Sequence, residues 1–377
     1  MLHSSQVRLL VLTADFPPLV WSGIGTAVAN QAGALADFGL DVHVLAPESL
    51  YLPIGQQDPS GFAVHALSGR KFPVDVRRYD LLHLHSLALS ELALEIKRRT
   101  GLPLIYTAHS LVEDELHAEK DADFWIAIQK IVMQISDHVI FLNRAERDRA
   151  IAMIPRLSTR SSVIPHPVPA PEGRREPTNA SGPVVFAGRF TRKKGISTLL
   201  EVIQRLSDRP GFNFVLAGGR ADGLGGKVIS CIRERYPSSC RLAGWLGREQ
   251  MDDLFSRAGV VLVPSFYEPY GMVALEAMRM GAPVLAAAVG GLIEIVTPQS
   301  GGKLIYSHDP DEWVMEIVEL KENQAANLRL RRQGPRYIET CFSSERFAGR
   351  LVHEVYDRFL PTARHSSAIA LRDSIVL

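Results

Sequence analysis

The stretch "VVLVPSFYEPYGMVALEAMRMGAPVLAAA", residues 260–288, decides the fold. Its first six residues are continuously apolar and end in a loop rich in Pro and Gly. A helical pattern over 272–280 follows, and then a second apolar run over 283–288. Strands that are apolar along their whole length are typical of parallel sheets covered on both faces. The stretch therefore predicts a strand–helix–strand unit of an α/β protein.

The same alternation of strands and helices extends over most of the chain, on both sides of one linker. Residues 165–183, "PHPVPAPEGRREPTNASGP", are rich in proline and have no periodicity, which is typical of a linker. Strands are expected at 7–13, 41–47, 80–85, 103–109 and 138–143 before it, and at 183–189, 212–219, 241–245, 260–265 and 283–288 after it. This organisation predicts two doubly wound, Rossmann-like α/β domains.

Composition excludes several classes of protein. The chain has 377 residues, 46% of them hydrophobic and 22% charged, and its formal net charge is +1. No overall field favours nucleic acid or an anionic membrane. The three cysteines show no pairing motif, and no apolar run reaches the ~20 residues that cross a bilayer. We expect a cytoplasmic protein without stable membrane insertion and without a nucleic-acid partner.

Ligands of open α/β sheets bind at the carboxyl ends of the strands, so these loops are the candidate sites. In the first, residues 16–26, Gly23 and Gly25 precede a helix expected from Thr26, and they suit either a tight turn or an anion site. The GxGxxG fingerprint of dehydrogenases is absent. His109 ends another strand. The pair His83 and His85 has metal-like spacing, but without a third ligand nearby a structural role is favoured.

Two loops of the second half carry charge. Residues 187–196, "AGRFTRKKGI", place Arg189 and Lys194 between a strand and a helix, which suits either a solvated basic loop or a phosphate clamp. The loop 266–271 and the helix after it carry Glu268 and Glu276, about two helical turns apart. Gly290 and Gly291 repeat the arrangement one strand later. Amide donors for a diphosphate, together with carboxylates for hydroxyls, describe a site for a sugar nucleotide.

At this point the chain resembles a known family. "EPYGMVALE", in which Glu268 and Glu276 flank seven residues, is similar to the E-x7-E signature of retaining GT-B glycosyltransferases, especially GT4. "TAHS", "VIPHPV", "AGRFTRKKG" and "VGGLIEIV" extend the resemblance over most of the chain. Two segments depart from the family pattern. The common Gly-Gly pair is Ser22-Gly23 here, and the common "IPNG" is "IPHP" with His166 and Pro167.

The resemblance implies roles for individual residues. Arg189 and Lys194 would neutralise the donor diphosphate, Glu276 would bind the ribose hydroxyls, and Glu268 would contact the transferred sugar. His109 would lie beside the anomeric centre, so that the catalytic set is His109, Arg189, Lys194 and Glu268. Backbone donors to sugar and phosphate would come from Pro269, Tyr270, Gly271, Met272 and Val273, and Gly23 would let the first loop approach the donor phosphate.

The implied fold is GT-B, two domains with a cleft between them. We expect an N-terminal acceptor-side domain over 1–167, a linker over 168–182, a nucleotide-sugar domain over 183–345, a helix over 346–362 returning to the first domain, and a tail over 363–377. The implied reaction is transfer of a hexosyl group from a nucleotide-diphosphate sugar, with retention and without a metal or cofactor. The alternatives are a GT-B sugar-nucleotide epimerase and a non-catalytic subunit that binds sugar nucleotides.

Acidic residues distinguish the expected acceptor side. Residues 1–165 contain 15 Lys and Arg against 18 Asp and Glu, a formal charge of −3. Glu113, Asp114 and Glu115 follow His109 closely and suit either a solvated helix start or a site for an amine-bearing acceptor. Anionic lipid would be repelled, so a small, soluble, polar acceptor is expected. Donor base, hexose, linkage and oligomeric state stay open at the level of sequence.

Overall fold

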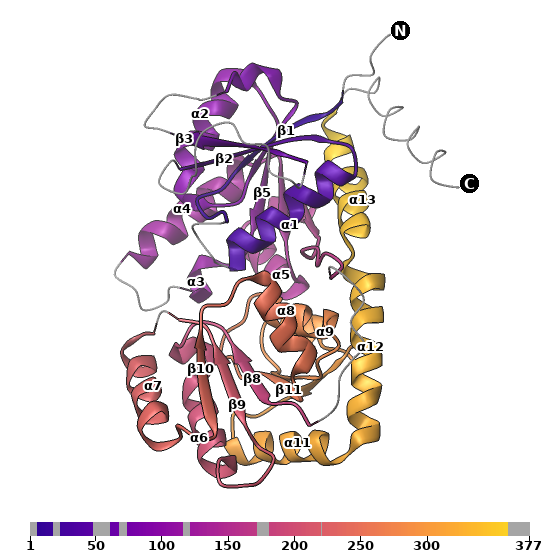
Figure 1. The fold of residues 1–377 in the computed structure, drawn as a ribbon. Helices are drawn as coiled ribbons and strands as arrows, with labels where there is room; N and C mark the ends of the chain where they lie inside the picture. Colours follow the sequence, from indigo (N-terminus) through magenta and orange to yellow (C-terminus); the bar gives the residue numbers. More distant parts are fainter. Residues whose placement is uncertain are drawn as a thin grey trace, which may run out of the picture. The chain divides into compact units, whose positions relative to one another are not determined.

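The computed structural model describes residues 6–17, 23–47, 61–67, 74–115, 121–171, 181–219 and 221–360 (Figure 1). The chain divides into two compact units. The first comprises Met1–Pro169 with Ser343–Leu377, and the second comprises Ala170–Phe342. No helix in the described part of the chain is both long and apolar enough to cross a membrane. The two units are described separately below.

The first unit contains a parallel sheet of seven strands in the order β3-β2-β1-β4-β5-β6-β7. The strands are β1 Arg8–Leu12, β2 Asp41–Pro47, β3 Ala63–Leu67, β4 Leu81–Leu84, β5 Leu104–Ala108, β6 His138–Phe141 and β7 Ser161–Val163. The helices are α1 Gly23–Asp37, α2 Ser90–Thr100, α3 Val112–Glu115, α4 Ala122–Ile135, α5 Arg144–Met153 and α13 Ser344–Glu354.

Alternation along β1 explains why this sheet is covered on both faces. Leu9 and Val11 belong to one apolar core, with residues of α1 and α13, while Leu10 and Leu12 belong to another, with residues of α2 and α4. Successive side chains of a strand point to opposite faces, so an unbroken apolar strand needs two covers. The helix α13 comes from the far end of the chain and packs against α1 (Figure 1).

The second unit contains a parallel sheet of six strands in the order β10-β9-β8-β11-β12-β13. The strands are β8 Val184–Ala187, β9 Phe214–Ala217, β10 Cys240–Gly244, β11 Val260–Val263, β12 Val284–Ala287 and β13 Gly302–Ile305. The helices are α6 Ile196–Leu206, α7 Gly223–Arg235, α8 Arg248–Arg257, α9 Met272–Arg279, α10 Leu292–Ile295, α11 Pro310–Glu322 and α12 Gln324–Phe342.

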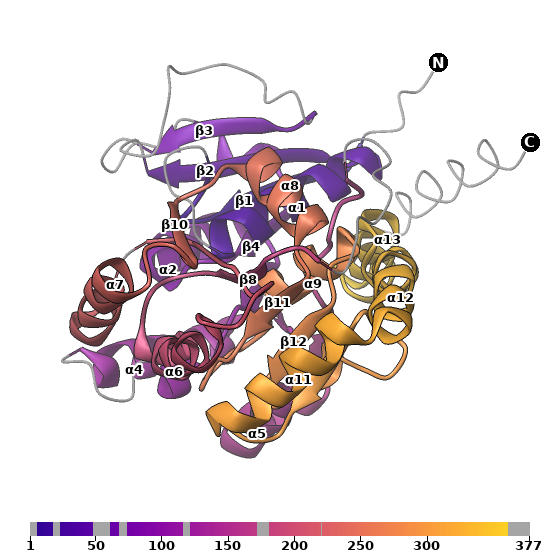
Figure 2. The same cartoon turned by 60° about the horizontal axis from the view of Figure 1, so that its bottom comes forward.

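Helices cover both faces of the second sheet as well. The helix α6 packs against α7 and α11 (Figure 2), and α9 packs against α8 and α12. The side chain of Arg331 in α12 is fully buried, and it donates hydrogen bonds to Asn327 Oδ1 at 2.7 Å and to the carbonyl oxygen of Gly281 at 3.3 Å. These bonds satisfy a charge that would otherwise be costly to bury.

The predicted α/β class and the two Rossmann-like halves are confirmed, but several element boundaries differ. The strands β3, β7 and β13 were not predicted, because they are short or lack a continuous apolar run. The helix α1 begins at Gly23, three residues before the expected start. The final helix is Ser344–Glu354 rather than 346–362, and a short 3₁₀ turn, Tyr356–Arg358, follows it. Most of the predicted linker and the tail 363–377 lie outside the described residues.

Candidate functional site

The predicted phosphate clamp lies in the loop between β8 and α6. The side chain of Arg189 is exposed and has no hydrogen-bond or ion-pair partner among the described residues. Gly195 ends the loop at a φ of 74°, where a Cβ would lie 1.9 Å from the carbonyl oxygen of Pro264. Only glycine fits there, and it holds the basic loop against the end of β11. Arg189 is therefore a cation available for an anionic ligand.

Lys194 and Glu268 form an ion pair across 74 residues of sequence. The ammonium Nζ of Lys194 donates to Glu268 Oε2 at 2.7 Å, and the Ser265 hydroxyl donates to the same oxygen at 3.2 Å. Glu268 is 8% exposed, so these donors compensate its desolvation. The amide of Phe266 also donates to the carbonyl oxygen of Lys193 at 2.8 Å. These bonds hold together two of the predicted site loops, the one between β8 and α6 and the one between β11 and α9.

The helix α9 begins directly after Glu268 and supplies amide donors. Its N-cap, Gly271, has a φ of 105°. Amide groups in the first turn of a helix have no intrahelical acceptor, so those of Met272 and Val273 lie where an anion or a polar ligand is favoured. Tyr270 is buried, whereas Pro269 is partly buried. The predicted run from Pro269 to Val273 therefore consists of the end of a loop and the start of a helix.

Gly290 and Gly291 allow a close approach of the backbone, as predicted, and the approaching backbone belongs to the loop that carries Glu268. A Cβ on Gly290 would lie 2.2 Å from the carbonyl oxygen of Glu268, and one on Gly291 would lie 2.5 Å from that of Pro269. The amide of Gly291 already donates to the Glu268 carbonyl at 3.0 Å. Because these glycines have no side chain, the backbone of the loop that carries Glu268 can pack directly against them. Glu294, the third carboxylate of this region, is exposed in α10.

Glu276 is a partly buried carboxyl group without a hydrogen-bond partner among the described residues. Burial raises the pKa of Glu276 to about 7, although the guanidinium groups of Arg279 and Arg248 act in the opposite direction. Arg279 is itself buried and forms an ion pair with Asp252 of α8. A carboxyl group left unpaired at this depth is suited to accept hydrogen bonds from ligand hydroxyls.

His109 lies in the first unit, at the end of β5, and both of its ring nitrogens are occupied. Nε2 is 3.1 Å from His85 Nδ1, and Nδ1 is 3.1 Å from His166 Nε2. His166 Nδ1 in turn is 2.8 Å from Gln31 Nε2. All four side chains are buried. The sequence noted the departure at His166, but nothing in its position along the chain indicated a bond to His109.

His83 packs beside this cluster. Its ring centroid is 4.2 Å from that of His85, as expected for alternate residues of one strand. The nitrogens of His83 bond to Tyr356 Oη at 2.6 Å and to Thr107 Oγ1 at 2.7 Å. Burial lowers the pKa of His83 and of His109 to about 3. No group of three or more potential metal ligands is found in the described ranges.

The remaining predicted residues of the first unit lie at helix starts. Gly23 is exposed at the first position of α1, and the loop residues 18–22 before it lie outside the described residues. Asp114 in α3 forms an ion pair with Arg149 of α5, with Nη2 donating to Oδ1 at 2.6 Å. Glu113 is exposed, and nothing is described of the Glu115 side chain. Asp114 therefore already has a cation partner.

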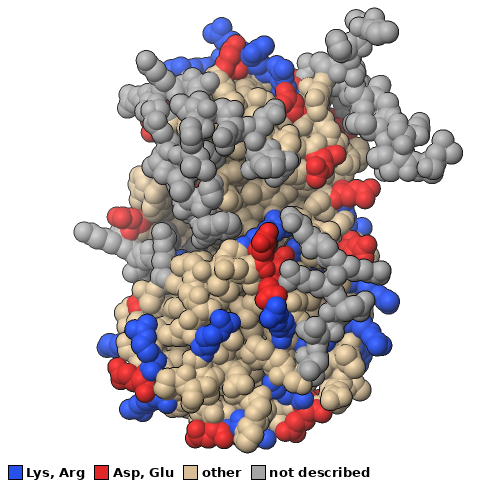
Figure 3. Space-filling view, viewed as in Figure 1, with Lys and Arg blue, Asp and Glu red and all other residues tan. Residues whose placement is uncertain are grey.

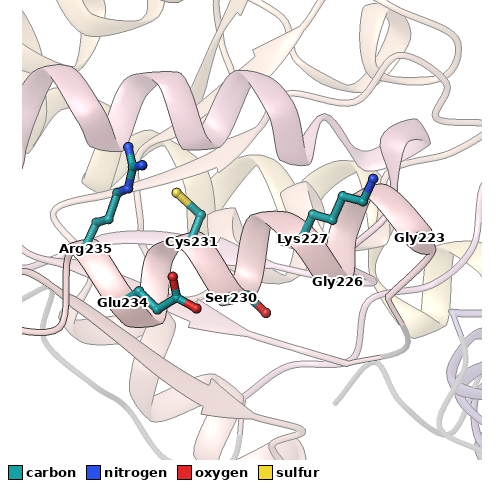
Figure 4. Close-up of a pocket in the computed structure, with 7 residues that line it drawn as sticks. All are labelled: Gly223, Gly226, Lys227, Ser230, Cys231, Glu234 and Arg235. Atoms are coloured by element: carbon teal, nitrogen blue, oxygen red, sulfur yellow. The ribbon is translucent and has the colours of Figure 1, made fainter.

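One depression on the surface lies apart from the predicted site residues. An open depression of about 530 Å³ runs along α7 and is lined by Gly223, Gly226, Lys227, Ser230, Cys231, Glu234 and Arg235 (Figure 4). All its lining residues belong to one helix, and none is a predicted site residue. On the face drawn in Figure 3, cationic and acidic side chains are interspersed.

Two family models and several known proteins match the sequence of this chain. Residues 21–170 match the family model described as Glycosyltransferase Family 4, and residues 176–337 match the one described as Glycosyl transferases group 1. A D-inositol 3-phosphate glycosyltransferase of Segniliparus rotundus is 29% identical over 276 residues, which are 68% of this chain and 61% of that relative. The aligned region thus spans less than two thirds of that relative's length.

Solved structures show the same fold. Sucrose-phosphate synthase from Thermosynechococcus elongatus superposes with a TM-score of 0.76 at 22% identity, covering 94% of this chain and all of that one. Anabaena HepE in complex with UDP-glucose superposes with a TM-score of 0.74 at 17% identity, covering 93% of this chain and all of that one. The predicted resemblance is confirmed: the chain belongs to the GT4-type glycosyltransferases and has their GT-B fold.

Proposed function

We propose that the protein transfers a hexosyl group from a nucleotide-diphosphate sugar to a hydroxyl of a small, soluble, polar acceptor, with retention of the anomeric configuration. The observation that carries the proposal is the set of unsatisfied groups around the β11–α9 loop. Among the residues that the structure describes, the Arg189 side chain has no anionic partner, the first amides of α9 have no acceptor, and the Glu276 carboxyl has no donor. A diphosphate joined to hydroxyl-bearing sugars satisfies all three.

Arg189 and Lys194 are assigned to the diphosphate. Negative charge develops on this group as the bond to the sugar breaks, and fixed cations and amide dipoles stabilise such charge more in the transition state than in the ground state. An ammonium group has three donors, so Lys194 can keep its bond to Glu268 and still reach a phosphate oxygen. With two cations assigned to the leaving group, the reaction needs no metal ion or other cofactor.

Glu268 is assigned to the transferred sugar and Glu276 to the ribose. Lys194 and Ser265 together engage Oε2 of Glu268, which leaves Oε1 to accept from a sugar hydroxyl. Lys194 thereby connects Glu268, which binds the sugar, to the diphosphate. The role implied for His109, beside the anomeric centre of the sugar, stays a prediction.

Names of related proteins support a nucleotide-sugar donor and a soluble acceptor. HepE was solved with UDP-glucose, and several relatives are named D-inositol 3-phosphate glycosyltransferases. We therefore place cyclitols and sugars first among the acceptors. An amine-bearing acceptor would rely on Glu113 and Glu115, since Asp114 is paired with Arg149.

A product assay tests the proposal. Purified protein is incubated with UDP-, ADP-, GDP- and TDP-hexoses and a set of cyclitols, aminocyclitols, sugars and anionic lipids, and the products are identified by mass spectrometry and by the anomeric coupling constant in NMR. A glycosylated soluble acceptor with the donor's anomeric configuration is expected. An epimerised sugar nucleotide without transfer would establish the epimerase alternative. Tight donor binding without any turnover would establish a non-catalytic subunit, and preference for anionic lipid would contradict the soluble acceptor.

A further inference from the structure

The Glu276 carboxyl lies one helical turn from a guanidinium group that is bonded to a different acid. Arg279 ends α9, one turn after Glu276. Its side chain is 5% exposed, and its Nη2 donates to Asp252 Oδ1 of the neighbouring helix α8. Residues three apart on a helix are neighbours and can form an ion pair. Arg279 therefore pairs with an acid of the next helix, although its own helix offers Glu276.

The charged groups that act on Glu276 belong to α8 and α9. Burial raises the pKa of Glu276 to about 7, the guanidinium groups of Arg279 and Arg248 act in the opposite direction, and the carboxylate of Asp252 adds to the rise. The strands β11 and β12, which also pack against α9, carry only apolar residues. From α12, the buried guanidinium of Arg331 is bonded to oxygens of its own surroundings.

Arg279 needs a carboxylate because it is a buried cation. Burial lowers the pKa of Arg279, and the two carboxylates that oppose this effect are those of Asp252 and Glu276. A buried charge that loses its partner costs far more free energy than a paired one. Without the charge of Asp252, Glu276 is the acid that can compensate Arg279. The two acids therefore compete for one guanidinium group, and in the structure Asp252 holds it.

An ion pair between Arg279 and Glu276 would change what Glu276 can bind. A guanidinium group presents a fork of N–H donors that can engage both oxygens of a carboxylate. Hydroxyl groups of a ligand would then have to displace it. The approaching positive charge would also lower the pKa of Glu276, since it favours the ionised form. With Arg279 bonded to Asp252, the oxygens of Glu276 stay available as acceptors.

We propose that Asp252 is a positioning residue of the donor site: by binding Arg279, it keeps the Glu276 carboxyl available to the ribose hydroxyls. This inference rests on the proposed function, because it takes Glu276 as the group that binds the ribose. It adds a residue of α8 that belongs to none of the predicted site loops and acts on the ligand only through Arg279 and Glu276.

The direct test measures how much the ribose hydroxyls contribute to binding. The Kd values of UDP, ADP and GDP and of their 2′,3′-dideoxy analogues are measured by titration calorimetry at pH 9, where the Glu276 carboxyl is ionised. The dideoxy analogue of the nucleotide that the wild type binds should be weaker by ~10-fold or more, the effect of hydrogen bonds to a charged group. This ribose ratio should fall strongly in Asp252→Asn, as it should in Glu276→Ala.

A second substitution distinguishes this role from a structural one. In Asp252→Asn/Arg279→Met the competing cation is removed as well, so Glu276 is again unpaired and the ribose ratio should recover. The double variant leaves no uncompensated cation at this site, so it is expected to fold. Asp252→Glu keeps the carboxylate and should keep most of the ratio. Asp253→Asn is the matched control: this acid of the same helix pairs with Arg257 at 2.8 Å, and its loss should leave the ratio unchanged.

The competition is also tested without any ligand. In protein labelled with carbon-13 at the glutamate carboxyl groups, the NMR signal of Glu276 is the one that is absent from Glu276→Gln. It should titrate near pH 7 in the wild type. In Asp252→Asn it should titrate at a lower pH, because a negative charge is lost nearby and the Arg279 guanidinium approaches. In Asp252→Asn/Arg279→Met it should titrate at a higher pH than in the single variant.

The outcomes separate the two proposals. Failure to transfer any sugar would end the proposed function, yet the titration of ligand-free protein would still decide whether Asp252 and Glu276 compete for Arg279. An unshifted Glu276 titration in Asp252→Asn, an unchanged ribose ratio in that variant, or a lost ratio that the double variant does not recover would each overturn the role of Asp252 and leave the glycosyltransferase proposal intact.

Discussion

Lowering the pH from 7.5 to 5.5 should destabilise the first unit and spare the second. The first unit buries His83, His85, His109, His138 and His166. Burial lowers the pKa of each, to about 3 for His83 and His109 and to about 4 for His138. In an unfolded chain the same groups titrate near the ordinary pKa of ~6.5. Below that value the unfolded chain binds more protons than the folded one. The stabilisation is therefore complete above pH ~6.5 and is lost as the pH falls.

The size of the effect follows from proton linkage. At pH 5.5 about nine in ten of the unfolded histidines are protonated, and each lowers the free energy of unfolding by ~1.4 kcal/mol relative to pH 7.5. Five such groups give a loss of ~7 kcal/mol, which is a large part of the 5–15 kcal/mol that stabilises a typical domain. Glu276 in the second unit acts in the opposite direction. Its raised pKa of about 7 stabilises that unit at pH 5.5, and this contribution is lost as the pH rises through 7.

Differential scanning calorimetry at the two pH values measures this difference, with urea denaturation to obtain the free energies. The transition of the first unit should move to a lower temperature at pH 5.5, whereas the transition of the second should not move to a lower temperature, because protonation of Glu276 stabilises that unit. In His109→Gln one titrating group is removed, so the pH-dependent loss should shrink by ~1.4 kcal/mol. Equal shifts of both transitions, or the same pH dependence in His109→Gln as in the wild type, would refute the reasoning.

Three predictions concern the donor site. Glu276→Ala should raise the donor KM by roughly tenfold with little change in kcat, and a kcat loss at constant KM would contradict the ribose assignment. In the wild type the donor KM should rise as the pH falls below about 7, because only the ionised carboxylate accepts from two hydroxyls. Arg189→Ala and Lys194→Ala should each lower kcat/KM by ~10²–10³-fold, whereas Arg192→Ala, an exposed cation of the same loop, should have a small effect in the same assay. Activity should persist in excess chelator, and its abolition with restoration by magnesium or manganese would show that these cations do not replace a metal.

The sequence grouped much of the proposed donor site because its residues are close together along the chain. Glu268, the amides after Gly271 and Glu276 lie within nine residues, on a strand end and the helix after it, so the local pattern was enough to group them. The same reasoning predicted a close backbone approach at Gly290 and Gly291, but not which segment approaches them. Their lack of a side chain allows a neighbouring loop to pack against them. A sequence alone does not show which segment of backbone will contact a given glycine.

By itself the sequence determined the α/β class, the two Rossmann-like halves and the strand ends that carry polar groups, because hydrophobic periodicity and Gly/Pro placement are local properties. Only the tertiary structure decided the order of the strands, the pairing of Lys194 with Glu268 and the line of hydrogen bonds from Gln31 to His85. Each of these joins segments separated by tens of residues. Such contacts depend on how whole elements pack, and no local pattern of residue types encodes which distant side chain will fill a given hydrogen bond.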